Sequence, residues 1–195
     1  MRQRGGARRP AGQLRIIGGR WRGRRLAIAE APGLRPTPDR VRETLFNWLA
    51  PVIDGARCLD LFAGTGALGL EALSRGARSA VLVESNAAVA ARLREHIRTL
   101  DAAGAEVVQA EALAYLAAGP ARVFDIAFLD PPYQSDLLGP CCQALEAGRW
   151  LAPGASIYLE VERGTPVPAL PAGWRLERDK TAGEVSYHLA RRAEA

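Results

Sequence analysis

The sequence predicts an α/β fold with a mostly parallel sheet that helices cover on both faces. Short apolar segments of strand length alternate with helical segments through most of the chain, and this alternation is typical of parallel sheets. The 195 residues are enough for one domain with a full hydrophobic core. A third observation is an arginine-rich start, which predicts a short basic extension before the sheet.

The expected elements follow the apolar pattern. Strands are expected at 57–62, 79–84, 105–110, 124–130, 155–162, 174–180 and 184–192, and helices at 67–75, 86–100 and about 134–147. The last two strands are expected to form a hairpin through "TAG", and residues 14–28 resemble two short strands around a Gly-rich turn.

An amphipathic helix is expected just before the sheet, in "RPTPDRVRETLFNWL". Thr37 is placed to cap it and Pro38 suits its first position. Its apolar face carries Val41, Leu45, Trp48 and Leu49, whereas Arg40, Arg42 and Glu43 are expected on the opposite face.

Basic charge is concentrated at the start of the chain. The first 25 residues contain nine arginines and no acid, so the rest of the chain is formally −4 although the total is +5. Clustered arginines that neutralise phosphates are typical of nucleic-acid binding. For residues 1–12 a solvated tail is an equal alternative. The candidate RNA contacts are Arg15, Arg20, Arg22, Arg24, Arg25 and Arg40, with Trp21 as a stacking surface.

Composition argues against several other classes of protein. Cys58, Cys141 and Cys142 are odd in number and not at metal-ligand spacing from either histidine, so we expect neither a disulfide framework nor a metal site. No apolar run has the length of a bilayer span, and the start lacks a secretory apolar core. We therefore expect a cytoplasmic protein that does not enter a membrane.

Four consecutive predicted strands end in an acid: Asp60, Glu84, Glu111 and Asp130. Ligands of parallel sheets bind beyond the carboxyl ends of the strands. The loop "GTGALG" with Glu84 further on matches a dinucleotide-binding fingerprint, but Asp60 just before it would repel a pyrophosphate. A cofactor with a ribose, a cationic group and no phosphate fits better, and S-adenosylmethionine has these properties.

The segment "DPPY" suits an exocyclic amine of a nucleobase as methyl acceptor. The Asp130 carboxylate and the Pro131 carbonyl can accept the two N–H bonds of such an amine, and two prolines fix the backbone. Tyr133 can stack on a base that has left its helix.

With these residues placed, the chain resembles the RsmD family of bacterial ribosomal RNA methyltransferases. The blocks "LRIIGGRWRGRRL", "RPTPDRVRETLFNWL", "LDLFAGTGALGLEALSRGA", "LVESN", "FLDPPY" and "DKTAGEVSYHL" occur in family order between residues 14 and 190. The resemblance implies a class I S-adenosylmethionine-dependent methyltransferase fold, Rossmann-like with a seven-stranded sheet. It also implies methylation of the exocyclic N2 of a guanine in 16S rRNA, within the 30S subunit or its assembly intermediate.

The resemblance also assigns roles to individual residues. Asp130, Pro131 and Tyr133 serve the target amine, and the cofactor is lined by Asp60, Ala63, Gly64, Gly66, Glu84, Ser85, Glu111, Ala112 and Asp130. Glu111 departs from the Asp or Asn that such enzymes commonly have there. We expect a flexible basic tail at 1–13, an RNA-contacting hairpin and helix at 14–50, and a methyltransferase domain at 51–195.

Two alternatives remain open at this point. A DNA adenine-N6 or cytosine-N4 methyltransferase would use the same D-P-P-Y chemistry, although such enzymes usually carry a sizeable target-recognition domain for which this chain has no room. An RNA-binding assembly factor with a vestigial cofactor pocket is the second. We expect a monomer.

Overall fold

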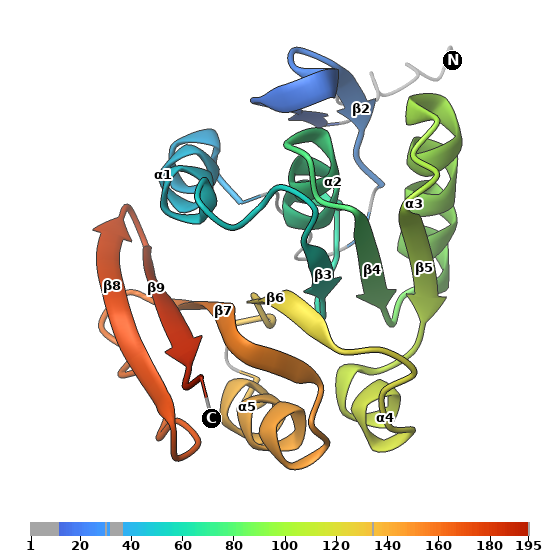
Figure 1. Cartoon of the computed structure of the whole chain (residues 1–195). Helices are drawn as coiled ribbons and strands as arrows, with labels where there is room; N and C mark the ends of the chain where they lie inside the picture. Colours follow the sequence, from blue (N-terminus) through green and yellow to red (C-terminus); the bar gives the residue numbers. More distant parts are fainter. Residues whose placement is uncertain (1–11, 30, 32–36, 134, 195) are drawn as a thin grey trace, which may run out of the picture.

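The computed structural model describes residues 12–29, 31, 37–133 and 135–194, and its centre is a seven-stranded sheet (Figure 1). The strands lie in the order β5-β4-β3-β6-β7-β9-β8, and β9 runs in the direction opposite to the other six. Their bounds are β3 Arg57–Asp60, β4 Ser79–Glu84, β5 Ala105–Gln109, β6 Phe124–Leu129, β7 Leu151–Glu162, β8 Trp174–Ala182 and β9 Val185–Arg192. This is the predicted seven-stranded methyltransferase sheet.

The strand order reverses between β3 and β6. From β3 the chain steps outward to β4 and β5, and then returns to place β6 on the other side of β3. At such a reversal the loops after the two central strands diverge and leave a crevice at their carboxyl ends, which is where ligands of these sheets bind. Asp60 ends β3 and Asp130 directly follows β6, so both predicted acids lie at this crevice.

Helices cover both faces of the sheet, as predicted (Figure 1). One face is covered by α1 Asp39–Leu49, α2 Ala67–Ser74 and α3 Ala87–Leu100, and the other by α4 Ala112–Ala117 and α5 Leu138–Ala147. Each face has its own apolar core. On the first face α1 packs on the sheet through Phe46, whose ring lies 6.0 Å from that of Phe128 on β6.

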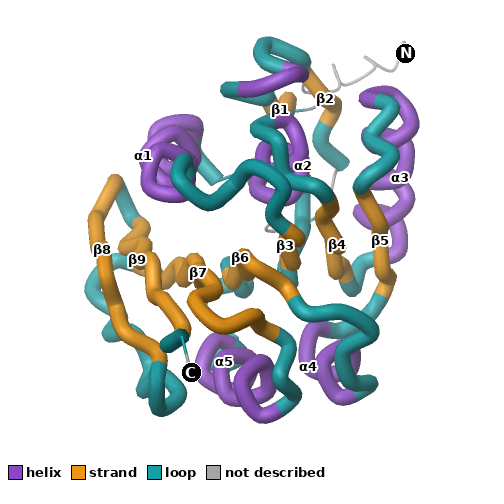
Figure 2. The backbone as a smooth tube through the Cα atoms, in the orientation of Figure 1, coloured by secondary structure: helices purple, strands orange, loops and turns teal. Residues whose placement is uncertain are grey.

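The basic segment forms the predicted pair of short strands. Strands β1 Gln13–Arg15 and β2 Arg25–Ala27 are antiparallel and are joined through the short 3-10 helix Gly19–Trp21. This hairpin packs on the outer side of α2, away from the sheet (Figure 2). The predicted tail, 1–13, lies outside the described residues except for Gly12 and Gln13.

The hairpin turn sits very close to the end of α2. Gly19 has a φ of +73°, and a Cβ there would lie 1.8 Å from the carbonyl oxygen of Ser74, so only glycine fits. The Ser74 hydroxyl donates to the carbonyl of Gly18 and accepts from the backbone N–H of Trp21. Trp21 is itself buried, so its predicted role as an exposed stacking surface is wrong.

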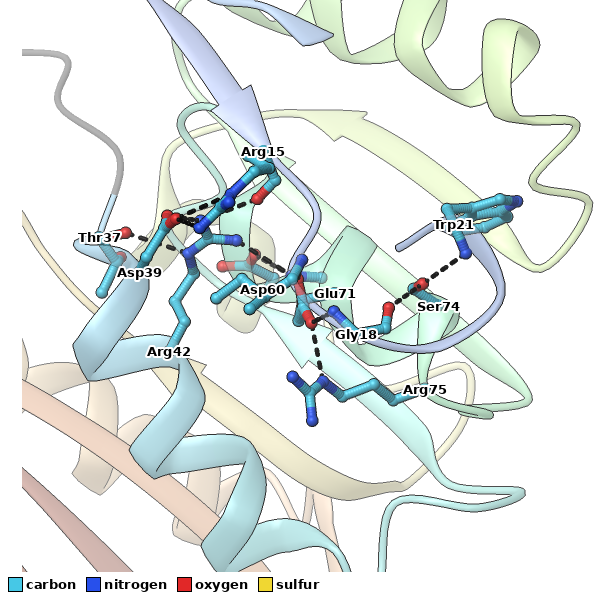
Figure 3. A network of polar contacts seen from close by, with 12 residues as sticks. Arg15, Gly18, Trp21, Thr37, Asp39, Arg42, Asp60, Glu71, Ser74 and Arg75 are labelled. Atoms are coloured by element: carbon cyan, nitrogen blue, oxygen red, sulfur yellow. Dashed lines mark hydrogen bonds and ion pairs between the residues drawn. The ribbon is translucent and has the colours of Figure 1, made fainter. Parts of the chain in front are cut away.

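A buried ion pair joins the hairpin to α1 and α2 (Figure 3). Glu71 on α2 is fully buried and accepts hydrogen bonds from the backbone N–H groups of Ile17 and Gly18 at 2.9 and 2.8 Å. Its carboxylate also lies 3.4 Å from the Arg42 guanidinium, which donates in turn to the carbonyl of Arg15. Each buried charge is thus paired and hydrogen-bonded, which is the condition under which buried ions are tolerated.

Three local predictions differ from the structure. Arg42 is buried, not on an exposed face, because its guanidinium pairs with Glu71 and Asp39. Thr37 does not cap α1: Pro38 is the N-cap, and the Thr37 hydroxyl donates to Asp130 instead. Helix α4 was not expected, because its six residues are too few to show a helical period.

We predict that Arg42→Met lowers the free energy of unfolding by about 3 kcal/mol. It removes one of the two cations that pair with the buried Glu71, Arg75 being the other, and it takes the buried donor away from the carbonyls of Arg15 and Thr37. Urea unfolding measures this change. As a control, Arg92→Met removes the cation of the exposed Arg92–Glu95 pair and is expected to cost less than about 1 kcal/mol. Equal, small effects of the two substitutions would show that the buried pair does not hold the hairpin.

Candidate active site

Four carboxylates at strand ends point to the same face of the sheet. Asp60 on β3 is in register with Leu82 and Phe128, and side chains alternate between faces along a strand. Two residues beyond these partners come Glu84 on β4 and Asp130 after β6, which therefore share the face of Asp60. This is the face covered by α1, α2 and α3, because Leu82 and Phe128 belong to that core.

The fourth carboxylate, Glu160 on β7, is not among the predicted site residues. Leu129 and Leu159 are in register, so Asp130 and Glu160 are the next neighbours on two adjacent parallel strands. Glu160 is buried. A signal for it was present, because a buried, apolar strand "SIYLEV" has one acid at a position that alternation places with Tyr158 on the inner side.

Asp60 is buried and has no cationic partner among the described residues. Its Oδ2 accepts a hydrogen bond of 2.9 Å from the backbone N–H of Gly69 in α2. Burial, and to a smaller extent the charge of Glu84, raises the pKa of Asp60 to about 7, although backbone N–H groups offset part of that shift. An ionised Asp60 is therefore costly unless a cation binds beside it.

Glu84 holds the glycine loop that follows β3. Its two carboxylate oxygens accept from the backbone N–H of Gly64 at 2.9 Å and from that of Asn86 at 2.7 Å. Asn86 in turn caps α3 by accepting from the N–H groups of Ala88 and Val89. Glu84 is half-buried, and each of its oxygens keeps a lone pair for a ligand hydroxyl.

The glycine loop is shaped by close packing against α3. Gly66 has a φ of +81°, and a Cβ there would lie 2.7 Å from Leu93 and 2.9 Å from Leu70. The loop therefore turns tightly into α2 with Ala63 buried and Gly64 half-exposed beside Glu84. Asp60, Ala63, Gly64, Gly66 and Glu84 thus lie at the carboxyl ends of β3 and β4 and in the loop between β3 and α2; their role in binding a cofactor stays a prediction.

Asp130 lies between Asp60 and Glu160. The Thr37 hydroxyl donates to its Oδ2 at 3.4 Å. Burial raises the pKa of Asp130 well above its usual value, and the charges of Glu160 and then Asp60 add to that effect. Burial also raises the pKa of Glu160, whereas hydrogen bonds from Tyr158 and Tyr133 lower it. Three carboxylates thus compete for ionisation in one small space.

A cavity of about 380 Å³ opens beside the prolines of "DPPY". Its lining includes Pro131, Pro132, Tyr133 and Glu160. The Tyr133 side chain is 48% exposed, and its hydroxyl donates to Glu160 at 3.3 Å. The cavity is therefore bordered by a half-exposed aromatic ring and by acidic side chains that include Glu160, an arrangement suited to a flat, N–H-bearing ligand. Asp130 is not among the residues that line it.

The remaining predicted cofactor residues lie along the same edge of the sheet without joining this cluster. Ser85 is exposed after β4. Glu111 is exposed at the N-cap of α4, makes no capping hydrogen bond, and is followed by the buried Ala112. No hydrogen bond within the described part of the chain connects these three side chains to Asp60, Glu84 or Asp130.

The predicted RNA-binding arginines are exposed on the hairpin and α1, and several have local partners. Arg15 pairs with Asp39, and Arg25 donates to Gln13. Arg20 donates to the carbonyl of Asp101, directly after α3, and Arg24 to that of Thr99 in the last turn of α3. Arg22 and Arg40 extend to solvent. Carbonyl partners do not neutralise charge, so the hairpin keeps a basic surface.

Two further classes of site are not seen in residues 12–29, 31, 37–133 and 135–194. No three His, Cys, Asp or Glu side chains are grouped so that they could hold a metal ion. None of the helices there has the length and apolarity needed to cross a bilayer.

Several known proteins are similar to this chain in sequence and in fold. A family profile described as conserved hypothetical protein 95 matches residues 14–191. Ribosomal RNA small subunit methyltransferase D of Escherichia coli strain K12 is 53% identical over 182 residues, which cover 93% of this chain and 91% of that protein. The protein of the same name from Haemophilus influenzae is 45% identical, over 91% of this chain and 93% of its own length.

A solved structure from Escherichia coli matches with a TM-score of 0.88 and 49% sequence identity, over 94% of this chain and all of that one. The strand order of the sheet and the similarity to these proteins indicate the same family and fold. The chain belongs to the RsmD family and has the class I methyltransferase fold.

Proposed function

We propose that this protein transfers a methyl group from S-adenosylmethionine to the exocyclic N2 of a guanine in 16S rRNA of the small ribosomal subunit. The observation that carries the proposal is the pair of acids at the reversal of strand order, the buried Asp60 and the partly buried Asp130, with Pro131 following Asp130. The names of the relatives support RNA of the small subunit as substrate. Such a substrate implies a cytoplasmic location.

The acidic strand ends fit S-adenosylmethionine. Asp60 is a buried carboxylate with no cation beside it among the described residues, which suits the ammonium group of the donor. Glu84 has free lone pairs for the ribose hydroxyls, and Gly64, which donates its N–H to Glu84, is half-exposed beside it and has no side chain to block a ligand. When bound, the donor supplies an electrophilic methyl group on a sulfonium.

Asp130, Pro131 and Tyr133 prepare the target amine. An exocyclic amine is a poor nucleophile because its lone pair is delocalised into the ring. Accepting its two N–H bonds on the Asp130 carboxylate and the Pro131 carbonyl turns that lone pair out of the ring plane. Asp130 can also take the proton that the amine loses, because burial raises the pKa of Asp130. Tyr133 offers its exposed ring face for stacking.

The reaction itself can be tested by product analysis. The protein is incubated with methyl-labelled S-adenosylmethionine and either small-subunit particles or duplex DNA, and the nucleic acid is digested to nucleosides. The expected product is N2-methylguanosine from the particles. N6-methyladenine or N4-methylcytosine from DNA would favour a DNA methyltransferase, and donor binding without any transfer would favour an assembly factor.

We predict that Asp130→Ala retains donor binding but loses activity at least roughly 100-fold, because the removed carboxylate serves the amine and its proton. Asp130→Asn is expected to be milder, since its amide oxygen still accepts one hydrogen bond. Calorimetry measures the affinity for the donor, and single-turnover kinetics measures the rate of methyl transfer. Turnover of the Ala variant within about tenfold of wild type would refute this role.

We predict that the affinity for S-adenosylhomocysteine rises with pH up to about 7. The folded protein holds a proton on Asp60 below the raised pKa of about 7, and a bound ammonium must displace that proton. The dissociation constant should therefore fall by up to about tenfold per pH unit between about pH 5.5 and 7, then level off.

Calorimetry at several pH values measures this dependence. Asp60→Asn should bind more weakly and without this pH dependence, whereas Asp130→Asn should keep it. A wild-type affinity that is flat over this range would exclude Asp60 as the partner of the ammonium.

We predict that replacing Arg20, Arg22, Arg24 and Arg25 with Ala weakens binding to small-subunit particles and lowers the salt slope of log K. The expected decrease is up to about 0.7 to 0.9 for each phosphate that the variant no longer neutralises. Donor affinity is expected to stay unchanged, because the hairpin lies on the outer side of α2.

The matched control replaces Arg175 and Arg178, two exposed arginines on the edge strand β8. It should leave the salt slope as it is. A loss of thermal stability together with donor binding in the hairpin variant would mean that its arginines are structural.

A further inference from the structure

Glu160 lies beside Asp130 at the carboxyl end of the neighbouring strand. The two strands β6 and β7 are parallel and in register up to Leu129 and Leu159, so the next residue of each carries a carboxylate on the same face. Adjacent strands are about 4.8 Å apart. A flat ligand whose amine is held by Asp130 can therefore reach Glu160 with another atom of the same edge.

Glu160 is held in one orientation by two tyrosines. The Tyr158 hydroxyl, buried on the same strand, donates to Oε2 at 2.6 Å, and the Tyr133 hydroxyl donates to Oε1 at 3.3 Å. No arginine or lysine of the described chain pairs with it. The long second bond and the cavity beside it leave Oε1 with acceptor capacity toward the ligand side.

Such a carboxylate is costly unless a donor meets it. Burial without a cation disfavours the charged form of a carboxylate. The two hydrogen bonds that Glu160 accepts come from neutral tyrosine hydroxyls, which do not balance its charge. Its place in the wall of a cavity, beside the acid proposed to hold an amine, indicates that the missing partner is an N–H group of the same ligand.

We propose that Glu160 accepts the N1–H of the target base and so selects guanine over adenine and cytosine. This inference rests on the proposed function, because it takes Asp130 and Pro131 as the acceptors of the exocyclic amine. The segment "DPPY" suits any exocyclic amine and so does not distinguish guanine from the other bases. Glu160, next to Asp130, would make this distinction.

The chemistry of the three bases gives the reason. In guanine the ring nitrogen next to the exocyclic amine carries a hydrogen, so the edge presents N–H donors side by side. In adenine and cytosine the ring nitrogen next to the amine carries a lone pair instead. A carboxylate at that position attracts guanine and repels the other two, and a site built for a hydrogen bond strongly rejects a ligand that lacks it.

Glu160→Gln tests this inference, because it keeps the shape of the side chain and removes its charge. The substrate is small-subunit RNA, assembled into particles, that carries either guanine or 2-aminopurine at the methylated position. 2-Aminopurine keeps the amine at C2 but has a lone pair at N1. The measured quantity is the ratio of kcat/KM for the two substrates.

The wild-type protein should prefer guanine by roughly 100-fold or more. Glu160→Gln should reduce this preference at least about tenfold, because its amide can turn its NH2 group toward the N1 lone pair. Affinity for S-adenosylhomocysteine should stay within about twofold, since the donor is held by other residues. The matched control is Glu184→Gln, which removes the charge of an exposed glutamate in the turn between β8 and β9, outside the cavity lining, and should keep the preference.

A second variant keeps the test decisive if Glu160→Gln does not fold. Tyr158→Phe retains the carboxylate but removes the hydroxyl that orients it, so it should also lower the preference for guanine. An unchanged preference in both variants, or an equal loss on both bases, would overturn the role of Glu160. If the wild-type protein made no N2-methylguanosine at all, the proposed function itself would fail. That outcome is distinct from a failure of the Glu160 role, in which the wild-type protein methylates guanine but the variants keep its preference.

Discussion

The site depends on one physical constraint, which is that several buried or partly buried carboxylates without a cation gather at one edge of the sheet. Asp60, Asp130 and Glu160 lie at or near the carboxyl ends of three adjacent strands, point to the same face and have no cationic partner among the described residues. A folded protein does not keep such charges from water without compensation. A cationic donor at Asp60 and a base rich in N–H groups at Asp130 and Glu160 would supply it.

Another buried acid, Glu71, has its charge balanced by the protein itself. It is fully buried, but Arg42 and Arg75 pair with it and two backbone N–H groups donate to it (Figure 3). Its role is therefore structural: it fixes the basic hairpin to α2. Arg42 also donates to the carbonyl of Thr37, whose hydroxyl contacts Asp130. Since Arg42 also donates to the carbonyl of Arg15, three consecutive hydrogen bonds, Arg15–Arg42, Arg42–Thr37 and Thr37–Asp130, join the surface proposed for RNA to the proposed catalytic acid.

Much of this architecture could be predicted from periodicity. The strands and the longer helices follow from apolar runs of the right length, and the acids Asp60, Glu84 and Asp130 stand out because each directly ends such a run. Glu160 was missed because β7 continues two residues beyond it, so it does not mark a strand end in the sequence. Only the register with β6 places it beside Asp130.

Other features depend on contacts between distant segments. The burial of Arg42 is set by Glu71, 29 residues away, and the Thr37 hydroxyl is directed to Asp130, 93 residues away. The pattern of "RPTPDRVRETLFNWL" assigns Arg42 to the exposed face and Thr37 to a cap, because it contains no information about these distant partners.

The most direct test of the account is the structure of the protein in complex with S-adenosylhomocysteine. We predict that the ammonium group lies within about 3.2 Å of an Asp60 carboxylate oxygen, or of a water that Asp60 holds, and that the ribose hydroxyls bind Glu84. The cavity beside Pro131 and Glu160 should remain open for the base. A ligand that fills this cavity instead, or that leaves Asp60 without a polar contact, would contradict the assignment of the acidic strand ends.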